Sequence, residues 1–146
     1  MTALCFKADN ERFERLKTLF PDDYDDRFRQ FTERTIDIYA VVCDGEPVGR
    51  IVANYTDRHL TGETAPDVRV CLSHFILRKA YRGRGLGSRL LRFALDDLAA
   101  HGYREFTVGV EPENSIALHI YRRNGFTEKI GHGHTPCEYD LYLKRI

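Results

Sequence analysis

The chain has 146 residues, of which 42% are apolar and 30% charged, and its 22 basic side chains balance 22 acidic ones. A chain of this length buries roughly two thirds of its extended surface on folding, which is enough for one self-sufficient domain. The composition excludes disordered, collagen-like and fibrous classes. The zero net charge argues against a generally basic nucleic-acid binder.

The sequence shows neither a membrane span nor a secretory signal. Its longest apolar run, Ile38 to Cys43, has six residues, whereas a bilayer requires roughly 20. Four widely spaced cysteines form no C-x-x-C pair, which argues against a disulfide framework or zinc knuckle and favours buried free thiols. We therefore expect a cytoplasmic protein.

In chain order, the first half carries signals for one strand, two helices and a hairpin. We expect an extended segment over residues 3–7, and helices on both sides of Pro21. The first helix is indicated by apolar residues close to helical spacing: Phe13, Leu16, Leu19 and Phe20. The Asp44-Gly45 pair between two apolar segments, 36–43 and 48–55, predicts an antiparallel hairpin. A polar loop should follow over residues 56–67.

The second half predicts strands and helices in alternation. A buried strand is expected over residues 68–77. The amphipathic segment 88–101 predicts a helix that Gly102 ends, and Asn114 is a suitable N-cap for a helix that Gly125 ends. Further strands are expected at residues 106–110, 126–130 and 138–143. This order predicts an α+β fold with a mixed sheet.

A basic, glycine-rich turn joins the strand expected at 68–77 to the helix that follows it. The segment from Arg78 to Arg92 holds six basic residues, three glycines and no acidic residue. The N-terminus of a helix presents unpaired N–H groups and the positive end of the helix dipole. Glycine lets a phosphate approach those groups and permits positive φ angles. The turn therefore predicts an anion site suited to a diphosphate.

The spacing of the glycines decides between three kinds of phosphate loop. The Walker pattern is absent, and a dinucleotide fingerprint fails because Ser88 stands where its third glycine belongs. A third pattern, Q/R-x-x-G-x-G/A, is met by Arg82, Gly85 and Gly87. Here the sequence resembles the GCN5-related N-acetyltransferase (GNAT) family, whose acetyl-CoA loop has this form. A turn of this composition can also be a simple helix cap.

A second motif supports the resemblance. The family signature N-x-x-A-x-x-x-Y-x-x-x-G-F is matched in register by five residues: Asn114, Ala117, Tyr121, Gly125 and Phe126. The resemblance covers residues 68–126 well. It implies one N-acetyltransferase domain over residues 1–146, with the GNAT-type α+β fold. In that fold the central sheet is mixed, mostly antiparallel and splayed at its middle, with helices on both faces.

The resemblance also implies which residues bind acetyl-CoA, the expected co-substrate. The backbone of Phe75, Ile76 and Leu77 would hold the pantetheine arm. The pyrophosphate would lie against the turn formed by Arg82, Gly83, Arg84, Gly85, Leu86, Gly87 and Ser88. Asn114 would touch the cofactor arm, and its role as an N-cap is compatible with that.

For the chemistry, the resemblance points to Tyr121, whose phenol would stabilise the departing thiolate. The general base stays open. Strand positions that hold a Glu or His in some relatives carry Cys71 and Ser73 here. Glu111 and His74 remain as candidates, although strand alternation places His74 on the opposite face. Weaker candidates are Asp67, Arg69 and His119. A base acting through water, or none, is equally compatible.

The implied reaction is acetyl transfer from acetyl-CoA to a primary amine of a small molecule or peptide, by direct attack in a ternary complex. The alternative is a non-catalytic acyl-CoA binding or sensing module, because no base is evident. A nucleotide or nucleic-acid binder is a further rival, but it leaves the second motif unexplained. We expect no nucleic-acid or membrane partner, and the resemblance suggests a homodimer.

Two other clusters have weaker functional readings. Four acidic residues, Asp22, Asp23, Asp25 and Asp26, could attract a cationic acceptor or simply complement the start of a helix. His132, His134 and Cys137 match no standard zinc spacing, so we expect no metal site.

Overall fold

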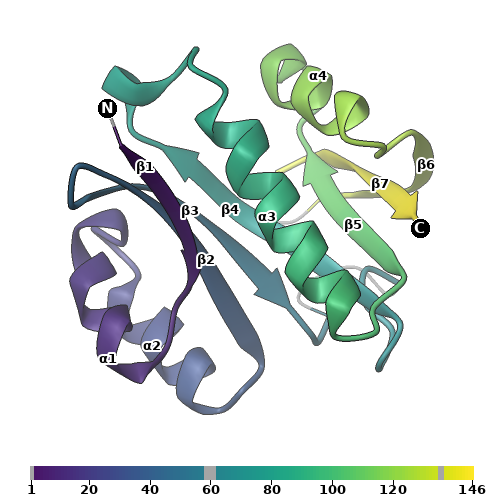
Figure 1. The fold of residues 1–146 in the computed structure, drawn as a ribbon. Helices are drawn as coiled ribbons and strands as arrows, with labels where there is room; N and C mark the ends of the chain where they lie inside the picture. Colours follow the sequence, from purple (N-terminus) through teal and green to yellow (C-terminus); the bar gives the residue numbers. More distant parts are fainter. Residues whose placement is uncertain (1, 58–61, 135–136) are drawn as a thin grey trace. The chain divides into compact units, whose positions relative to one another are not determined.

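The computed structural model describes residues 2–57, 62–134 and 137–146. These residues form two compact units (Figure 1). The first unit holds the described residues up to 53 together with 74–97, and the second holds those of 54–73 and 98–146. Three elements contribute to both units, namely β3 (Glu46–Asn54), whose last residue falls in the second unit, β4 (Arg69–Leu77) and α3 (Leu86–Ala100).

The first unit contains three strands that precede β4 in the strand order: β1 (Ala3–Lys7), β2 (Ile36–Cys43) and β3 (Glu46–Asn54). β1 pairs antiparallel with β2 along its whole length. Asp44 and Gly45 have φ angles of 50° and 87°. Two successive positive φ angles define the tight turn for which Asp-Gly is favoured. The turn between β2 and β3 therefore confirms the prediction from this pair.

The helices of this unit differ in one respect from the expectation. The helix expected over Phe13 to Phe20 is one α-helical turn, α1 (Asn10–Phe13), followed by a 3₁₀ segment, η1 (Glu14–Leu19). The buried residues Phe13, Leu16 and Leu19 are spaced by three, which is the period of a 3₁₀ helix. The second predicted helix is present as α2 (Tyr24–Thr32).

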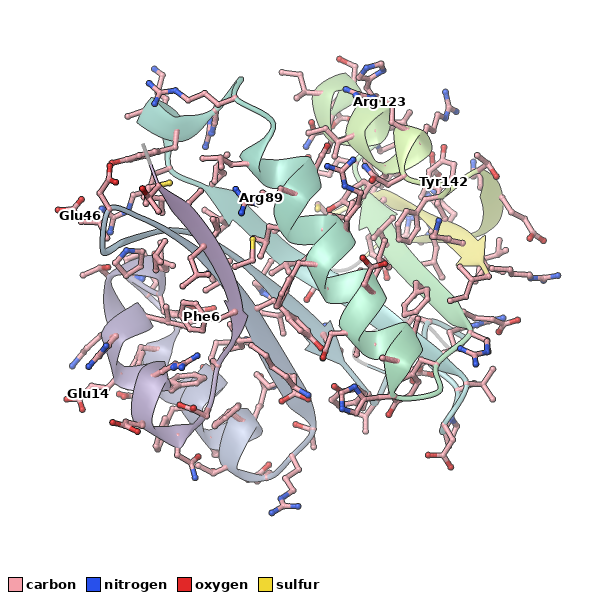
Figure 2. All side chains as sticks on the ribbon, viewed as in Figure 1. Phe6, Glu14, Glu46, Arg89, Arg123 and Tyr142 are labelled. Carbon is pink, nitrogen blue, oxygen red and sulfur yellow. The ribbon has the colours of Figure 1, made fainter. Side chains whose placement is uncertain are left out.

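An aromatic cluster forms the core beneath these helices. The Phe13 ring is fully buried, and its centroid lies 4.8 Å from that of Phe31 and 5.3 Å from that of Phe28. Phe20 stacks on Phe13 at 5.9 Å. Phe6, labelled in Figure 2, packs against the cluster from β1. Aromatic pairs at these separations add stabilisation beyond their buried area.

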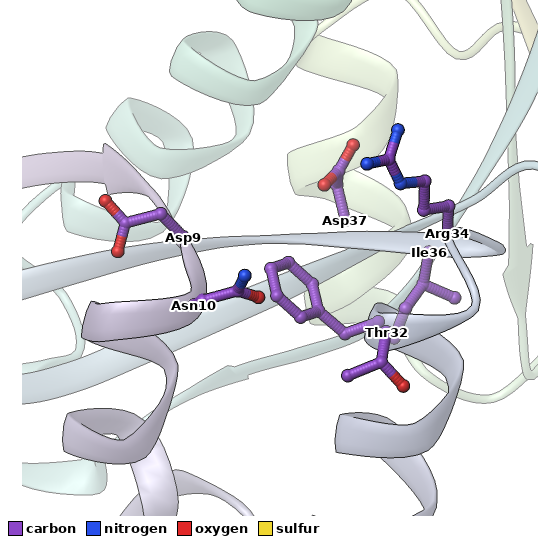
Figure 3. Close-up of a pocket in the computed structure, with 7 residues that line it drawn as sticks. Asp9, Asn10, Thr32, Arg34, Ile36 and Asp37 are labelled. Atoms are coloured by element: carbon purple, nitrogen blue, oxygen red, sulfur yellow. The ribbon is translucent and has the colours of Figure 1, made fainter.

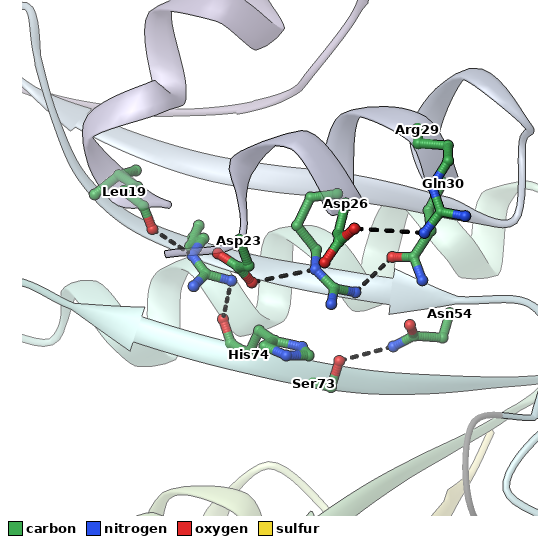
Figure 4. Close-up of polar contacts among 10 residues, drawn as sticks. Leu19, Asp23, Asp26, Arg29, Gln30, Asn54, Ser73 and His74 are labelled. Atoms are coloured by element: carbon green, nitrogen blue, oxygen red, sulfur yellow. Dashed lines mark hydrogen bonds and ion pairs between the residues drawn. The ribbon is translucent and has the colours of Figure 1, made fainter. Parts of the chain in front are cut away.

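A buried arginine joins this core to β4 (Figure 4). The side chain of Arg50 is 2% exposed, and its guanidinium lies 4.2 Å from the centre of the Phe20 ring. Its Nε donates to the Leu19 carbonyl at 2.8 Å, and its Nη1 donates to the His74 carbonyl at 3.3 Å. Arg50 therefore satisfies two backbone acceptors from separate elements.

His74 has a φ angle of 50° in the middle of β4. A non-glycine residue in this left-handed region interrupts the regular pleat of a strand. The alternation by which the sequence analysis assigned a face to His74 therefore does not run unbroken through this residue.

The second unit orders its strands as the first part of β4, then β5 (Glu105–Val110), β7 (Tyr139–Arg145) and β6 (Glu128–Gly133). β4 and β5 are parallel, whereas β5–β7 and β6–β7 are antiparallel, which confirms the mixed sheet. The parallel register pairs Arg69–Leu72 with Glu105–Val108 and ends there. Within the described residues, no helix is long and apolar enough to cross a membrane.

The predicted caps of α4 (Ser115–Arg123) are present in this unit. The Asn114 side chain accepts a hydrogen bond from the Ala117 N–H at 3.2 Å. Gly125 has a φ angle of 96°, and the Phe126 N–H donates back to the Tyr121 carbonyl at 3.0 Å. Because Phe126 belongs to this helix end, β6 begins at Glu128 instead of at residue 126, where we expected it.

We expect Arg50→Met to lower the free energy of unfolding by about 3 kcal/mol, because two buried carbonyls lose their donor. Urea unfolding measures this as a lower midpoint with an unchanged slope. The matched control is Arg29→Met, since Arg29 makes an exposed ion pair with Asp26 at 3.5 Å, and such pairs contribute little. Equal midpoints for the two variants would contradict the role assigned to Arg50.

Candidate functional site

The glycine-rich turn lies in the first unit and leads into α3. Gly83 and Gly85 both have φ angles of 77°, which glycine adopts without strain. The Gly85 carbonyl accepts a hydrogen bond from the Arg89 N–H at 3.0 Å. α3 therefore begins at Leu86, two residues before the predicted start.

This early start places the first turn of α3 inside the predicted anion-binding loop. The N–H groups of Leu86, Gly87 and Ser88 belong to that first turn, where an α-helix has no internal acceptors for its N–H groups. The helix dipole adds partial positive charge at the same end. The local backbone thus has the donors and the field that an anionic group requires.

β4 lies against this first turn through the Phe75 side chain. A Cβ atom at Gly87 would lie 3.4 Å from the tip of the Phe75 ring. This is an ordinary van der Waals separation, so the Phe75 ring lies beside the first turn of α3. Of the three residues predicted to hold the pantetheine arm, Phe75 thus has its side chain next to the loop.

The arginines in and beside the turn contact neighbouring carbonyls or an aromatic ring. Arg82 Nε donates to the Leu77 carbonyl at 2.9 Å, and the Arg84 guanidinium lies 5.9 Å from the centre of the Tyr81 ring. Arg89, labelled in Figure 2, donates to the Ala3 carbonyl at 3.0 Å. A hydrogen bond to a neutral carbonyl does not neutralise the charge of Arg82 or Arg89, so the turn keeps an attractive field for anions.

Tyr121 belongs to the second unit, on α4. It is 6% exposed, and its ring meets the Phe126 ring edge-on at a centroid distance of 5.7 Å. Burial, together with the neighbouring Cys71 thiol, raises the pKa of Tyr121 well above its ordinary value. The phenol therefore stays protonated at neutral pH and can act as a hydrogen-bond donor.

The two candidate bases from the sequence lie in different units. Glu111 follows β5 in the second unit, where its Oε1 accepts a hydrogen bond from Cys137 Sγ at 3.3 Å. His74 belongs to the first unit, at the positive-φ position of β4. Cys137 is exposed, contrary to the expectation of buried thiols, whereas Cys43 and Cys71 are buried.

A buried carboxylate that sequence reasoning missed lies beside Cys71. Glu63 is 1% exposed, and its Oε2 accepts a hydrogen bond from Cys71 Sγ at 3.4 Å. The Thr107 hydroxyl donates to the Glu63 carbonyl at 2.7 Å. Cys71 and Thr107 are partners across β4 and β5, so their side chains share one face of the sheet. Glu63 therefore covers that face.

Polar residues before β4 make hydrogen bonds with one another, and polar composition of this kind is typical of an ordinary loop. Asp57 accepts hydrogen bonds from the Thr64 N–H at 2.8 Å and from the Gly62 N–H at 3.3 Å. These bonds tie Asp57 to the two neighbours of Glu63 in the sequence. A lone glutamate in a polar segment gave no sign of burial, since its partners come from distant strands.

A pocket of about 490 Å³ lies elsewhere in the first unit (Figure 3). None of the predicted site residues lines this pocket. Its lining consists of Asp9, Asn10, Phe31, Thr32, Arg34, Ile36 and Asp37. Two of its acids already serve the fold, because Asp9 caps α1 at the Arg12 N–H and Asp37 pairs with Lys7 at 3.5 Å. We assign this pocket no part in the reaction.

Comparison with known proteins agrees with the motifs. Residues 5–126 match the family described as "Acetyltransferase (GNAT) family". The mycothiol acetyltransferase of Corynebacterium glutamicum (strain R) is 45% identical over 56 residues, which cover 38% of this chain and 19% of that protein. The spermidine N(1)-acetyltransferase of Escherichia coli (strain K12) is 29% identical over 125 residues, which cover 84% of this chain and 58% of that protein. The chain thus spans about one to three fifths of these relatives.

Solved structures show the same fold. The PaiA N-acetyltransferase of Thermoplasma acidophilum, crystallised in complex with coenzyme A, superposes with a TM-score of 0.72 and covers 100% of both chains. The two sequences are 17% identical. The likeness therefore concerns the architecture, and it confirms the α+β fold that the order of elements predicted.

Proposed function

The chain belongs to the acetyltransferase (GNAT) family, and on this premise we propose that residues 1–146 act as one N-acetyltransferase domain. The proposed reaction transfers the acetyl group of acetyl-CoA to a primary amine. The observation that carries the proposal is the turn from Arg82 to Ser88. Its left-handed glycines, helix N–H groups and arginines provide what the diphosphate of a CoA molecule requires.

The residues of the first unit fit this co-substrate. The N–H groups of Leu86, Gly87 and Ser88 would bind the diphosphate, and Arg82 and Arg84 would add positive charge. The pantetheine arm would follow the backbone of Phe75, Ile76 and Leu77. Since the Leu77 carbonyl already accepts from Arg82, we assign most of the arm's hydrogen bonds to the other two residues.

In the reaction the neutral amine attacks the thioester carbonyl, the C–S bond breaks, and the nitrogen loses one proton. We propose that Tyr121 donates a hydrogen bond to the departing sulfur as negative charge develops there. Burial makes this phenol a weaker acid than a thiol of ordinary pKa near 8.5. The thiolate therefore leaves hydrogen-bonded to Tyr121 and takes its proton from water, while the phenol keeps its own.

For the amine's proton we propose Glu63 as the final acceptor, ahead of Glu111 and His74. Glu63 places a carboxylate against Cys71, the strand position that holds a base in some relatives. Because the resemblance makes Cys71 a substrate-facing position, we propose that Glu63 acts through it: the Cys71 sulfur takes the proton of the amine as its own thiol proton passes to Glu63. Glu111 is exposed and accepts from Cys137, and the His74 backbone is held by Arg50.

The acceptor is proposed as a primary amine without further restriction. The acidic residues near α2 add little to this choice, because two of them have local partners. Asp23 pairs with Arg27 at 3.2 Å and Asp26 pairs with Arg29 at 3.5 Å (Figure 4). That the protein is cytoplasmic and forms a homodimer stays a prediction, which cell fractionation and light scattering of the purified chain test.

We expect acetyl-CoA and CoA to bind through the turn, whereas ATP and NAD bind weakly or not at all. Isothermal titration of Gly85→Asp should show affinity for acetyl-CoA at least about tenfold lower than that of Gly85→Asn, a difference of about 1.4 kcal/mol. Asp and Asn have the same shape and tolerate a positive φ angle, so the comparison isolates the repulsion between carboxylate and diphosphate. Equal affinities, or a preference for ATP or NAD, would argue against the diphosphate site.

Tyr121→Phe should lower kcat for acetyl transfer by about 10²-fold, as the loss of a hydrogen bond to developing charge typically does. Its affinity for acetyl-CoA should stay nearly unchanged, as measured by titration beside the turnover assay. Unchanged turnover would remove Tyr121 from the mechanism. Tight acetyl-CoA binding by the unmodified chain, with no transfer to spermidine, amino acids or peptide N-termini, would favour the sensing module instead.

Glu63→Gln should lower kcat/KM by about 10²-fold, because an amide cannot accept the proton. The matched control is Glu111→Gln, which should keep kcat/KM unchanged. Urea unfolding of each variant separates this effect from a loss of stability. The opposite pattern, with Glu111→Gln impaired and Glu63→Gln active, would transfer the role to Glu111.

A further inference from the structure

A cluster of metal-binding side chains lies at the hairpin of β6 and β7, apart from the residues assigned to acetyl transfer. It consists of His132, His134 and Glu138, all of them exposed. One ligand atom from each residue lies within 4.8 Å of the other two. Exposure on all three side chains gives an ion free access from solvent.

The hairpin itself brings these side chains together. His132 lies in β6 and His134 follows two residues later, and side chains two apart along an extended segment point to the same side. Their rings meet edge-on with centroids 4.9 Å apart. Glu138 directly precedes β7, and its Oε1 lies 3.6 Å from His134 Nδ1. The group is therefore produced by strand geometry across one hairpin.

A second carboxylate orients the first histidine. Asp140 is the partner of His132 in the antiparallel register, and its Oδ1 lies 2.8 Å from His132 Nδ1. The same carboxylate oxygen is 3.1 Å from Lys129 Nζ, which fixes its position. With Nδ1 engaged, His132 presents Nε2 to a ligand. This is the carboxylate–histidine arrangement that supports metal-bound histidines in proteins.

The sequence analysis expected no metal site, because His132, His134 and Cys137 match no standard zinc spacing. The structure brings a different third side chain to the two histidines, since the Cys137 thiol donates to Glu111 at 3.3 Å. Glu138 takes its place and completes a set of two imidazoles and one carboxylate. Such a set suits zinc, which binds three protein ligands and a water in its open sites, whereas magnesium and calcium prefer oxygen ligands alone.

We propose that His132, His134 and Glu138 bind one Zn²⁺ ion, with water as the fourth ligand. Ligand atoms around tetrahedral zinc lie about 3.4 Å apart. The three ligand atoms would therefore move closer together by rotation about side-chain bonds. Exposed side chains can make that movement without disturbing the core. The proposal is independent of the acetyl-transfer reaction, because none of the three residues takes part in it.

The experiment is isothermal titration of the chelator-treated chain with zinc chloride. We expect one ion per chain, and no heat of binding with magnesium at the same concentration. The double variant His132→Ala/His134→Ala should lose zinc binding, whereas the control His101→Ala/His119→Ala should retain it. Asp140→Asn should weaken binding by about 10- to 100-fold, as loss of an orienting carboxylate does. Visible absorption of bound Co²⁺ gives an independent readout of tetrahedral coordination.

Cys137→Ser distinguishes the proposed site from one that uses the thiol, and it should bind zinc like the unmodified chain. Urea unfolding without metal shows whether each variant keeps its fold. The proposal is overturned if the unmodified chain binds no zinc, if the His132→Ala/His134→Ala variant binds it equally well, or if Cys137→Ser abolishes binding.

Discussion

The buried guanidinium of Arg50 holds the backbone of β4 where that strand departs from regular geometry. A positive φ angle at His74 is unfavourable for a residue with a side chain, and such a conformation persists only when its surroundings stabilise it. Arg50 supplies that stabilisation through its bond to the His74 carbonyl, and it is itself fixed by Leu19 and Phe20. The last three residues of β4, Phe75 to Leu77, directly follow His74 and lead toward the glycine-rich turn.

Burial decides the chemistry of the second unit. Tyr121 is kept neutral by its apolar surroundings, so its phenol serves the proposed reaction as a hydrogen-bond donor and not as a strong acid. Glu63 places its carboxylate on the sheet face that carries Cys71 and Thr107. A neutral hydrogen-bond donor suits the departing sulfur, and a buried carboxylate suits the acceptance of the amine's proton.

The sequence by itself determined the features that depend on neighbouring residues. The Asp44-Gly45 pair predicted its turn because few other dipeptides adopt two successive positive φ angles. Asn114 predicted the start of α4, and Gly125 its end, since caps act within one helical turn. The glycine-rich turn was predicted for the same reason, because its N–H groups and glycines lie within a few residues of one another.

Only the tertiary structure decided the features that join distant segments. The positive φ angle at His74 depends on Arg50, which lies 24 residues away in sequence. Glu63 is buried because Cys71 and Thr107 meet it from two strands. Glu138 lies beside the histidines, whereas the Cys137 thiol donates to Glu111. Local propensity carries no information on such contacts, since each partner is supplied by a different part of the folded chain.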